Sequence, residues 1–439
     1  MRRSFPQFMF AIVALGAALP RVAEGPPLAG TEETFISWLV ANSNGEHAGA
    51  PVTLIEINDN CLVDQPLPWS PLNYALFLDA ATQFKARVAA IEPALAWDDQ
   101  RLTPEQMLQQ PQYERYLHEC VLRTPLLELG AVLGYPEDPD VLPAAQPMPV
   151  FRNVTGAMDA VPDYMVVEAE PGEDIRLTAG LGFTNIPPKT EPTVEHAPMV
   201  FRYRGQVVPS FALEALMLWN GVTPGEVEVD LGTEIKLGKK LSIPINAAGA
   251  MRLDWKQPVD RAGFDDLELA ANQLDNKHAP IIDPAKLKDR LVVLARTDAA
   301  SETLALPNGR LGSAGEVYAE ALATAETGAF AKGAGMAGVW TVILMGLGLG
   351  WVVSERSKLL TAPLVGGFLA GYLLVCLTVF EMTRVALPLT PMVGLAVFIG
   401  VFRVLGVESG EVDFGWVRRV WERWGVTGAR WVAGKVKRG

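Results

Sequence analysis

The chain has 439 residues, of which 49% are apolar, and it carries a formal net charge of −13. Its length suggests more than one structural unit. The charge is divided unevenly, because residues 24–330 carry 44 acidic and 22 basic side chains, whereas residues 331–439 carry 6 acidic and 12 basic ones. An acidic middle argues against nucleic acid as a partner, and the basic, apolar ends indicate that this middle part is a water-exposed domain tied to membrane lipid.

Residues 1–23 have the composition of an export signal. Arg2 and Arg3 precede an apolar stretch of about a dozen residues, which is shorter than the length that a full membrane span requires. We expect this segment to direct the following domain out of the cytoplasm. It is either a signal peptide that is cleaved or a signal anchor that is retained.

Residues 24–330 alternate between helical and strand patterns. The patterns predict helices at 31–41, 71–85, 104–121, 211–219 and 313–327. They predict strands at 52–57, 88–91, 127–133, 180–186, 200–203, 226–231, 241–245 and 291–295, and a long loop at 135–165. Because strand–helix–strand units occur near both ends, we expect an α/β (mixed α+β) domain with a partly parallel sheet and antiparallel hairpins.

Polar and aromatic side chains follow two of these strands. Asp59 lies in a polar turn after strand 52–57, Trp69 precedes the next helix, and Glu92 follows strand 88–91. Since ligands bind at the carboxyl ends of strands in such sheets, Asp59, Trp69 and Glu92 are candidate ligand-binding residues. Neighbouring strands would also bring Glu56, Asp59 and Glu92 together. The alternative is a capped turn with a solvated Asp59.

No sequence motif for catalysis or cofactor binding occurs. The chain has no P-loop, no Gly-x-Ser-x-Gly, no Cys-x-x-Cys and no His-Glu-x-x-His. Its histidines lie far apart in sequence, at His47, His118, His196 and His278. We therefore expect no enzymatic activity, no cofactor and no metal site.

Two of the three cysteines lie in the predicted exported domain. Cys61 and Cys120 are therefore in a compartment where a disulfide can persist, and they are either free buried thiols or a bonded pair. Cys376 lies within an apolar run and is expected to be an inert packing residue.

Three apolar runs follow, at residues 335–353, 359–380 and 385–405. Each has roughly the 20 residues that cross a bilayer, which predicts a three-helix transmembrane bundle. Basic residues after the third run place the C-terminus in the cytoplasm, so three crossings place residues 24–330 outside it. Small residues four apart, such as Gly346 with Gly350 and Gly367 with Gly371, allow close helix contacts and suggest a homodimer.

Residues 406–439 form a short basic tail. Read as a helix, it places Phe414, Trp421 and Trp424 on one face and Arg419 and Arg423 on the other. Such a helix suits the headgroup layer of anionic lipid. The alternatives are a helix packed on a partner protein or a disordered stub.

Several short motifs follow one another in a definite order along the chain. They are Ile57-Asn58-Asp59, Pro68-Trp69-Ser70-Pro71, Val88 to Glu92, Gly182-Phe183-Thr184-Asn185, Pro209 to Leu213, Ile243 to Asn246, Arg290 to Leu294, and Gly315 to Ala319. Together with the three apolar runs, this order resembles the second type of CHASE domain, an extracytoplasmic sensory domain. The chain departs from the family pattern after its last strand, where Ala295-Arg296 stands in place of a glycine.

The resemblance implies a sensory protein of the bacterial inner membrane whose large domain is periplasmic. The family usually continues into a cytoplasmic kinase or cyclase, whereas about 35 residues follow the third apolar run here. We therefore expect the protein to detect a small ligand or an envelope partner and to signal through a separate cytoplasmic or envelope protein. The alternative is a structural or docking subunit of a bacterial envelope complex.

Overall fold

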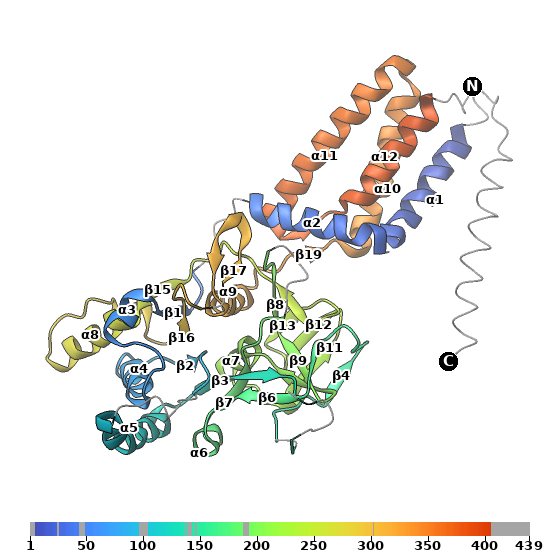
Figure 1. Ribbon diagram of the computed structural model, residues 1–439. Coiled ribbons are helices and arrows are strands. Elements are labelled where there is room, and N and C mark those ends of the chain that lie inside the picture. Colours follow the sequence, from blue (N-terminus) through green and yellow to red (C-terminus); the bar gives the residue numbers. More distant parts are fainter. Residues whose placement is uncertain are drawn as a thin grey trace. The chain divides into compact units, whose positions relative to one another are not determined.

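The chain divides into two compact units (Figure 1). The computed structural model describes residues 5–23, 26–43, 49–95, 104–136, 138, 143–144, 147–187, 193–301 and 303–404. Gly45–Phe330 form an α/β unit, and a helical unit combines Met1–Asn44 with Ala331–Gly439.

A seven-stranded sheet forms the centre of the α/β unit, in the order β15-β1-β16-β2-β3, with both β6 and β7 paired to β3. Its strands are β1 (Val52–Ile57), β2 (Val88–Ile91), β3 (Leu127–Gly134), β6 (Val166–Ala169), β7 (Gly180–Phe183), β15 (Asp260–Gly263) and β16 (Leu291–Arg296). All the pairings are parallel except that of β6 with β3. The central strands β1, β2 and β16 consist mostly of buried Val, Ile, Leu and Ala, as expected for a parallel sheet covered on both faces.

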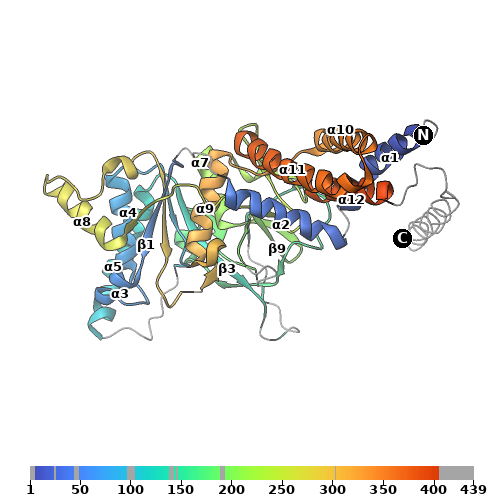
Figure 2. The ribbon, with the colours of Figure 1, turned by 90° about the horizontal axis from the view of Figure 1, so that it is seen from above.

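Helices cover both faces of the sheet, as Figures 1 and 2 show. They are α4 (Pro71–Gln83), α5 (Pro104–Arg123) and α8 (Phe264–Asp275) on one face, and α7 (Phe211–Asn220) and α9 (Ala314–Thr327) on the other. Side chains alternate along each strand, so Ile55 packs in the core with α4 and α8, while Leu54 packs with α7 and α9. The unit is therefore a three-layer α/β/α domain.

Short antiparallel pieces complete the α/β unit. They are a β9–β10 hairpin (Val200–Tyr203, Gln206–Pro209) with β5 (Asp163–Tyr164); a β11–β12–β13 meander (Val227–Asp230, Glu234–Leu237, Leu241–Pro244) with β4 (Asn153–Thr155); β8 (His196–Pro198) with β14 (Ala250–Arg252); and β17 (Leu304–Ala305) with β18 (Leu311–Gly312). The mixed α/β class predicted from the sequence is thus confirmed. The predicted loop 135–165 contains β4 and β5, which have only three and two residues.

The helical unit contains α1 (Phe5–Ala23), α2 (Pro26–Asn42), α10 (Gly335–Ser354), α11 (Thr361–Thr383) and α12 (Leu389–Val404). By length and composition, α10 and the stretch from Lys358 to Thr383 could each cross a membrane. The third helix, predicted at 385–405, begins at Leu389 and continues to Val404, the last residue that the structure describes. The first residues of the predicted run are not helical, because Val385–Ala386 form strand β20, which pairs with β19 (Lys332–Gly333). A bundle of three spanning helices therefore stays a prediction.

The two N-terminal helices pack within the helical unit. Ile12 of α1 is fully buried in a core shared with α10 and α12. The Glu32 carboxylate of α2 accepts the backbone N–H groups of Leu389 and Thr390, each at 2.9 Å, and so caps α12. The α/β unit accordingly begins at Gly45, whereas the sequence placed the boundary of the exported domain at residue 24.

The small residues of α10 and α11 lie in different surroundings. A Cβ on Gly346 would overlap Leu395 and approach Ile12, so Gly346 packs inside the helical unit rather than on an open face. Gly367 and Gly371 of α11 have open space at the position of a Cβ. The predicted tail 406–439 lies outside the described residues.

Candidate functional site

A pocket of about 410 Å³ opens where the parallel strands of the sheet end. It is lined by Leu67, Pro68, Trp69, Tyr74, Glu92, Pro93, Ala94, Val132, Thr184 and Arg296. Glu92 follows β2, Arg296 ends β16, and Thr184 follows β7. This is the edge at which open α/β sheets bind ligands. Two of the three predicted ligand-binding residues, Trp69 and Glu92, are brought together here.

Aromatic side chains form one wall of this pocket. Trp69 is 3% exposed, and its indole N–H donates to the Gln65 carbonyl oxygen at 2.9 Å. Its ring contacts Tyr74 at a centroid distance of 5.7 Å and Phe264 at 4.6 Å. Burial raises the pKa of Tyr74, which keeps its hydroxyl neutral at the pocket wall. The wall is held by contacts to both α4 and α8.

Opposite charges form the polar end of the pocket. The Arg296 Nε and Nη2 atoms donate to the two carboxylate oxygens of Asp298, both at 2.9 Å, and Asp298 is 2% exposed. This bidentate pair lowers the pKa of Asp298. Burial raises the pKa of Glu92 to about 7, although the Arg296 backbone N–H donates to Glu92 Oε2 at 3.4 Å.

A glycine allows β3 to approach the pocket edge. A Cβ on Gly130 would overlap the Glu92 carbonyl oxygen and contact the Thr184 methyl group. Only a residue without a side chain therefore fits between the ends of β2 and β7.

Asp59, the third predicted residue, does not line this pocket. Asn58 caps the short helix α3 (Asp59–Asp64) by accepting from the N–H groups of Asn60 and Cys61. Asp59 is exposed, and its Oδ1 accepts from the Ala299 N–H at 3.1 Å. This bond ties α3 to the loop after β16. The capped turn with an exposed Asp59 corresponds to the alternative interpretation of this sequence.

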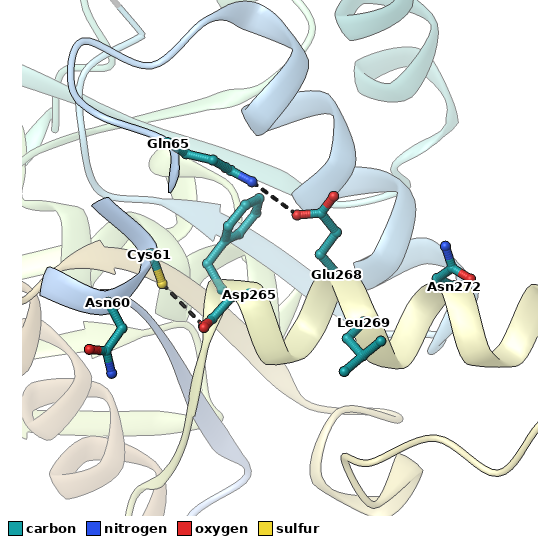
Figure 3. Close-up of a pocket in the computed structure, with 8 residues that line it drawn as sticks. Asn60, Cys61, Gln65, Asp265, Glu268, Leu269 and Asn272 are labelled. Atoms are coloured by element: carbon teal, nitrogen blue, oxygen red, sulfur yellow. Dashed lines mark hydrogen bonds between the residues drawn. The ribbon is translucent and has the colours of Figure 1, made fainter. Parts of the chain in front are cut away.

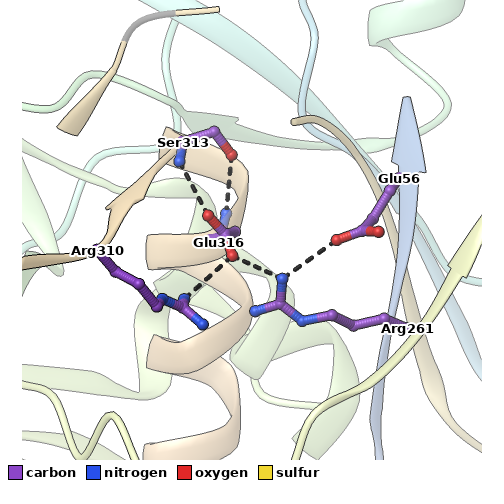
Figure 4. A network of polar contacts seen from close by, with 5 residues as sticks. All are labelled: Glu56, Arg261, Arg310, Ser313 and Glu316. Atoms are coloured by element: carbon purple, nitrogen blue, oxygen red, sulfur yellow. Dashed lines mark hydrogen bonds and ion pairs between the residues drawn. The ribbon is translucent and has the colours of Figure 1, made fainter. Parts of the chain in front are cut away.

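The expected convergence of Glu56, Asp59 and Glu92 is wrong. The reason is sheet order, because β16 lies between β1 and β2. Glu56 instead pairs with Arg261 at 3.2 Å, and Arg261 pairs with Glu316 of α9 at 2.6 Å. Figure 4 shows this network, which also includes Arg310 and the N-cap Ser313.

A family model for the CHASE2 domain matches residues 10–353, more than three quarters of the chain. The chain belongs to the CHASE2 domain family. No curated protein and no solved structure matches it significantly. The resemblance read from the motifs is thus confirmed, and CHASE2 is an extracytoplasmic sensory domain family. The matched region begins in α1 and ends in α10.

The CHASE2 domain has a second, smaller pocket of about 290 Å³ between α3 and α8. Figure 3 shows its lining, which is Asn60, Cys61, Gln65, Phe264, Asp265, Glu268, Leu269 and Asn272. Cys61 Sγ donates to Asp265 Oδ1 at 3.2 Å, and Gln65 Nε2 donates to Glu268 Oε2 at 3.1 Å. Its polar groups thus bond largely to one another.

Cys61 and Cys120 are both buried free thiols in the structure, which is the first of the two alternatives given above. Burial raises the pKa of each thiol. Cys120 Sγ accepts a hydrogen bond from Arg123 Nη2 at 3.2 Å, whereas Cys61 Sγ donates to Asp265. Among the described residues no group of three or more His, Cys, Asp or Glu could hold a metal ion.

Three further carboxyl groups of the CHASE2 domain are buried, and the sequence analysis did not single them out. Burial raises the pKa of Glu214 to about 7 and that of Glu320 to about 8, and it raises the pKa of Glu128 well above its usual value. A signal was present in the sequence, since Glu128 and Glu214 are lone acids within apolar segments, LELGAVLG and FALEALMLWN. A charge at a core position of a strand or helix indicates a buried, perturbed group.

Proposed function

We propose that the CHASE2 domain of this protein detects a small ligand in the pocket formed by Trp69, Glu92 and Arg296. The observation that supports this most directly is the pocket itself, which combines an aromatic wall with two half-buried ionisable groups at the ligand-binding edge of the sheet. Membership of a sensory family supports the same function.

The order of the chain offers a route from this pocket to the helical unit. Arg296 ends β16, and the Asp298 that it binds begins the segment that leads into α9. α9 ends at Thr327, and α10 begins only a short distance later, at Gly335. A ligand that bonds to Arg296 therefore contacts the end of β16. From there the chain continues through α9 into α10. The ion pair of Glu316 with Arg261 ties α9 to β15, and the ion pair of Arg261 with Glu56 ties β15 to β1.

We further propose that the helical unit spans the bacterial inner membrane, with the CHASE2 domain periplasmic and the C-terminus cytoplasmic. Burial of Ile12 among α10 and α12 supports retention of α1 as an anchor rather than its removal. The open glycine positions of α11, Gly366, Gly367 and Gly371, would admit the close approach of another helix. That helix belongs to a second copy of the chain or to a partner protein that receives the signal.

Ligand detection is tested with the full chain in detergent and a set of small metabolites. A ligand that binds the folded state raises the unfolding temperature. Ala94→Phe would fill the pocket that Ala94 lines, whereas Ala157→Phe adds the same ring at an exposed loop position. We expect a ligand to stabilise the wild type and the Ala157 variant but not the Ala94 variant. If no metabolite raises the unfolding temperature and envelope proteins co-purify stably, the docking-subunit alternative holds.

A further inference from the structure

The polar end of the pocket points to the class of ligand. We propose that the pocket binds a zwitterionic α-amino acid with an apolar or aromatic side chain, its ammonium group on Glu92 and its carboxylate on Arg296. This inference rests on the proposed sensory function and names the substance that is sensed.

Glu92 is suited to receive the ammonium group. Within the part of the chain that the structure describes, its carboxyl group has one hydrogen bond, the 3.4 Å contact from the Arg296 N–H to Oε2. Oε1 is therefore available at the pocket wall. Burial, with a smaller contribution from the Asp298 charge, raises the pKa of this group to about 7 against the opposing effect of Arg296, so its ionised form is only partly stabilised. A bound cation would supply that stabilisation and lower the pKa.

Arg296 is suited to receive the carboxylate. A guanidinium group has five N–H donors, and Asp298 uses one at Nε and one at Nη2. Among the described residues, the donors on Nη1 have no hydrogen-bond partner. The bond to Asp298 fixes the plane of the guanidinium group, and a fixed planar donor set suits a carboxylate better than a flexible ammonium would.

The combination of the two groups favours a zwitterion over either simple ion. A plain carboxylic acid would satisfy Arg296 but would repel ionised Glu92, and a plain amine would satisfy Glu92 but would meet the charge of Arg296. A plain acid also leaves the partly buried Glu92 charge without a cationic ligand group, which is costly, whereas a plain amine leaves the Nη1 donors of Arg296 without an acceptor. A zwitterion pairs both charges and adds no net charge.

The remaining lining suits an apolar side chain. Leu67, Pro68, Pro93 and Val132 present hydrocarbon surface, and Trp69 presents an aromatic one. About 410 Å³ is within the range of small-molecule sites and has room for a leucine- or phenylalanine-sized ligand with water. Since the wall offers few groups for a second charge, acidic and basic amino acids should bind less well.

The test is calorimetric titration of the full chain in detergent with L-leucine and L-phenylalanine. Phenethylamine, which lacks the carboxylate, and 3-phenylpropionate, which lacks the amine, are the matched analogues. We expect at least one of the two amino acids to bind. If phenylalanine binds, its two analogues should bind at least tenfold more weakly than phenylalanine does. Glu92→Gln and Arg296→Lys should each weaken binding at least tenfold, while Glu268→Gln, in the other pocket, should not. Binding should also weaken as the pH falls below about 7, because protonated Glu92 no longer pairs with an ammonium group.

Unligated unfolding temperatures of all variants are compared first, so that misfolding is not read as lost binding. The proposal is overturned if the two analogues bind as tightly as the amino acid, or if Glu92→Gln folds normally and binds it unchanged. If neither amino acid binds but another metabolite stabilises the chain and not its Ala94→Phe variant, the ligand class is wrong and the sensory function stands. If nothing stabilises the chain, both fail.

Discussion

Glu128 of β3 and Glu214 of α7 lie against the same strand, β7. The Glu128 carboxyl group occupies the space where a side chain on Gly182 would lie, and the Glu214 carboxyl group occupies that of Gly180. Their mutual repulsion adds to burial in raising the pKa of Glu128. Three of their four carboxyl oxygens are buried without a hydrogen-bond partner among the described residues. The pair is accommodated in this core in its neutral form.

We therefore predict that the CHASE2 domain loses stability as the pH rises. The folded-state pKa of Glu214 is raised to about 7, above its unfolded value near 4.5, so the folded state binds more protons between these values. The stabilisation is fully present below about pH 4.5 and is lost as the pH rises through about 7. Denaturant unfolding of the full chain, followed by tryptophan fluorescence from pH 5 to 9, measures this.

Glu214→Gln tests the assignment, because an amide stays neutral throughout. The free energy of unfolding of this variant minus that of the wild type should be larger at pH 8.5 than at pH 5, by at most about 3 kcal/mol. Glu173→Gln, at an exposed position of α6 (Glu173–Arg176), should show no such gain. An identical pH profile for wild type and Glu214→Gln would refute a buried, titrating Glu214.

Gly130→Ala should destabilise the edge of the sheet that bears the pocket. Its Cβ would overlap a backbone oxygen, that of Glu92, which cannot rotate away. We expect a loss of at least about 2 kcal/mol in the free energy of unfolding, together with weaker ligand binding. Gly225→Ala is the matched control, since open space surrounds that position, and its unfolding should change little. Equal stability of the two variants would contradict the close approach of β3 to β2.

The sequence predicted the central strands well and the edges of the sheet poorly. β1 and β2 coincide with the predicted 52–57 and 88–91, because buried parallel strands are uninterrupted runs of apolar residues. β15 was missed, since Asp260–Gly263 has a polar sequence and is held by its pairing with β1 rather than by propensity. α8, which follows it, was missed as well.

The candidate site was predicted in part for a related reason. Motif spacing located Trp69 and Glu92, each beside a recognisable element, and both line the pocket. Arg296 was noted only as a departure from the family pattern, because its position next to Glu92 depends on β16 lying between β1 and β2. Strand order is a long-range property that local patterns do not contain. The same order separates Glu56 and Asp59 from Glu92.

Gly346→Leu and Gly367→Leu should have different effects, although their sequence surroundings are similar. Gly346 packs against Leu395 within the helical unit, so its substitution should lower the unfolding temperature of that unit whether or not the chain associates. Gly367 faces open space, so its substitution should leave the fold intact and weaken self-association. Thermal unfolding and native mass measurements in detergent separate these outcomes. A chain that is monomeric under all conditions would exclude the predicted homodimer.

Single cysteines can determine the membrane topology crossing by crossing. Lys277 lies at an exposed position after α8, and Ser357 lies in the exposed connector between α10 and α11. Because Cys61, Cys120 and Cys376 are buried, background labelling should be low. With an impermeant thiol reagent, Lys277→Cys should react in intact cells, and Ser357→Cys only after lysis. The reverse pattern would place the CHASE2 domain in the cytoplasm and contradict the proposed function.

A third cysteine, in place of Val426, tests whether α12 crosses as well. The described part of α12 has 16 residues, about 24 Å at 1.5 Å per residue, whereas the hydrocarbon core is about 30 Å thick. Its N-terminus is capped by Glu32 near the β19–β20 pair, at the end of the unit where α10 begins and α11 ends. If α12 crosses with help from residues after Val404, Val426→Cys should react only after lysis, like Ser357→Cys. Labelling of Val426→Cys in intact cells, with Ser357→Cys still protected, would mean that only α10 and α11 form the C-terminal crossings and that the basic tail lies outside.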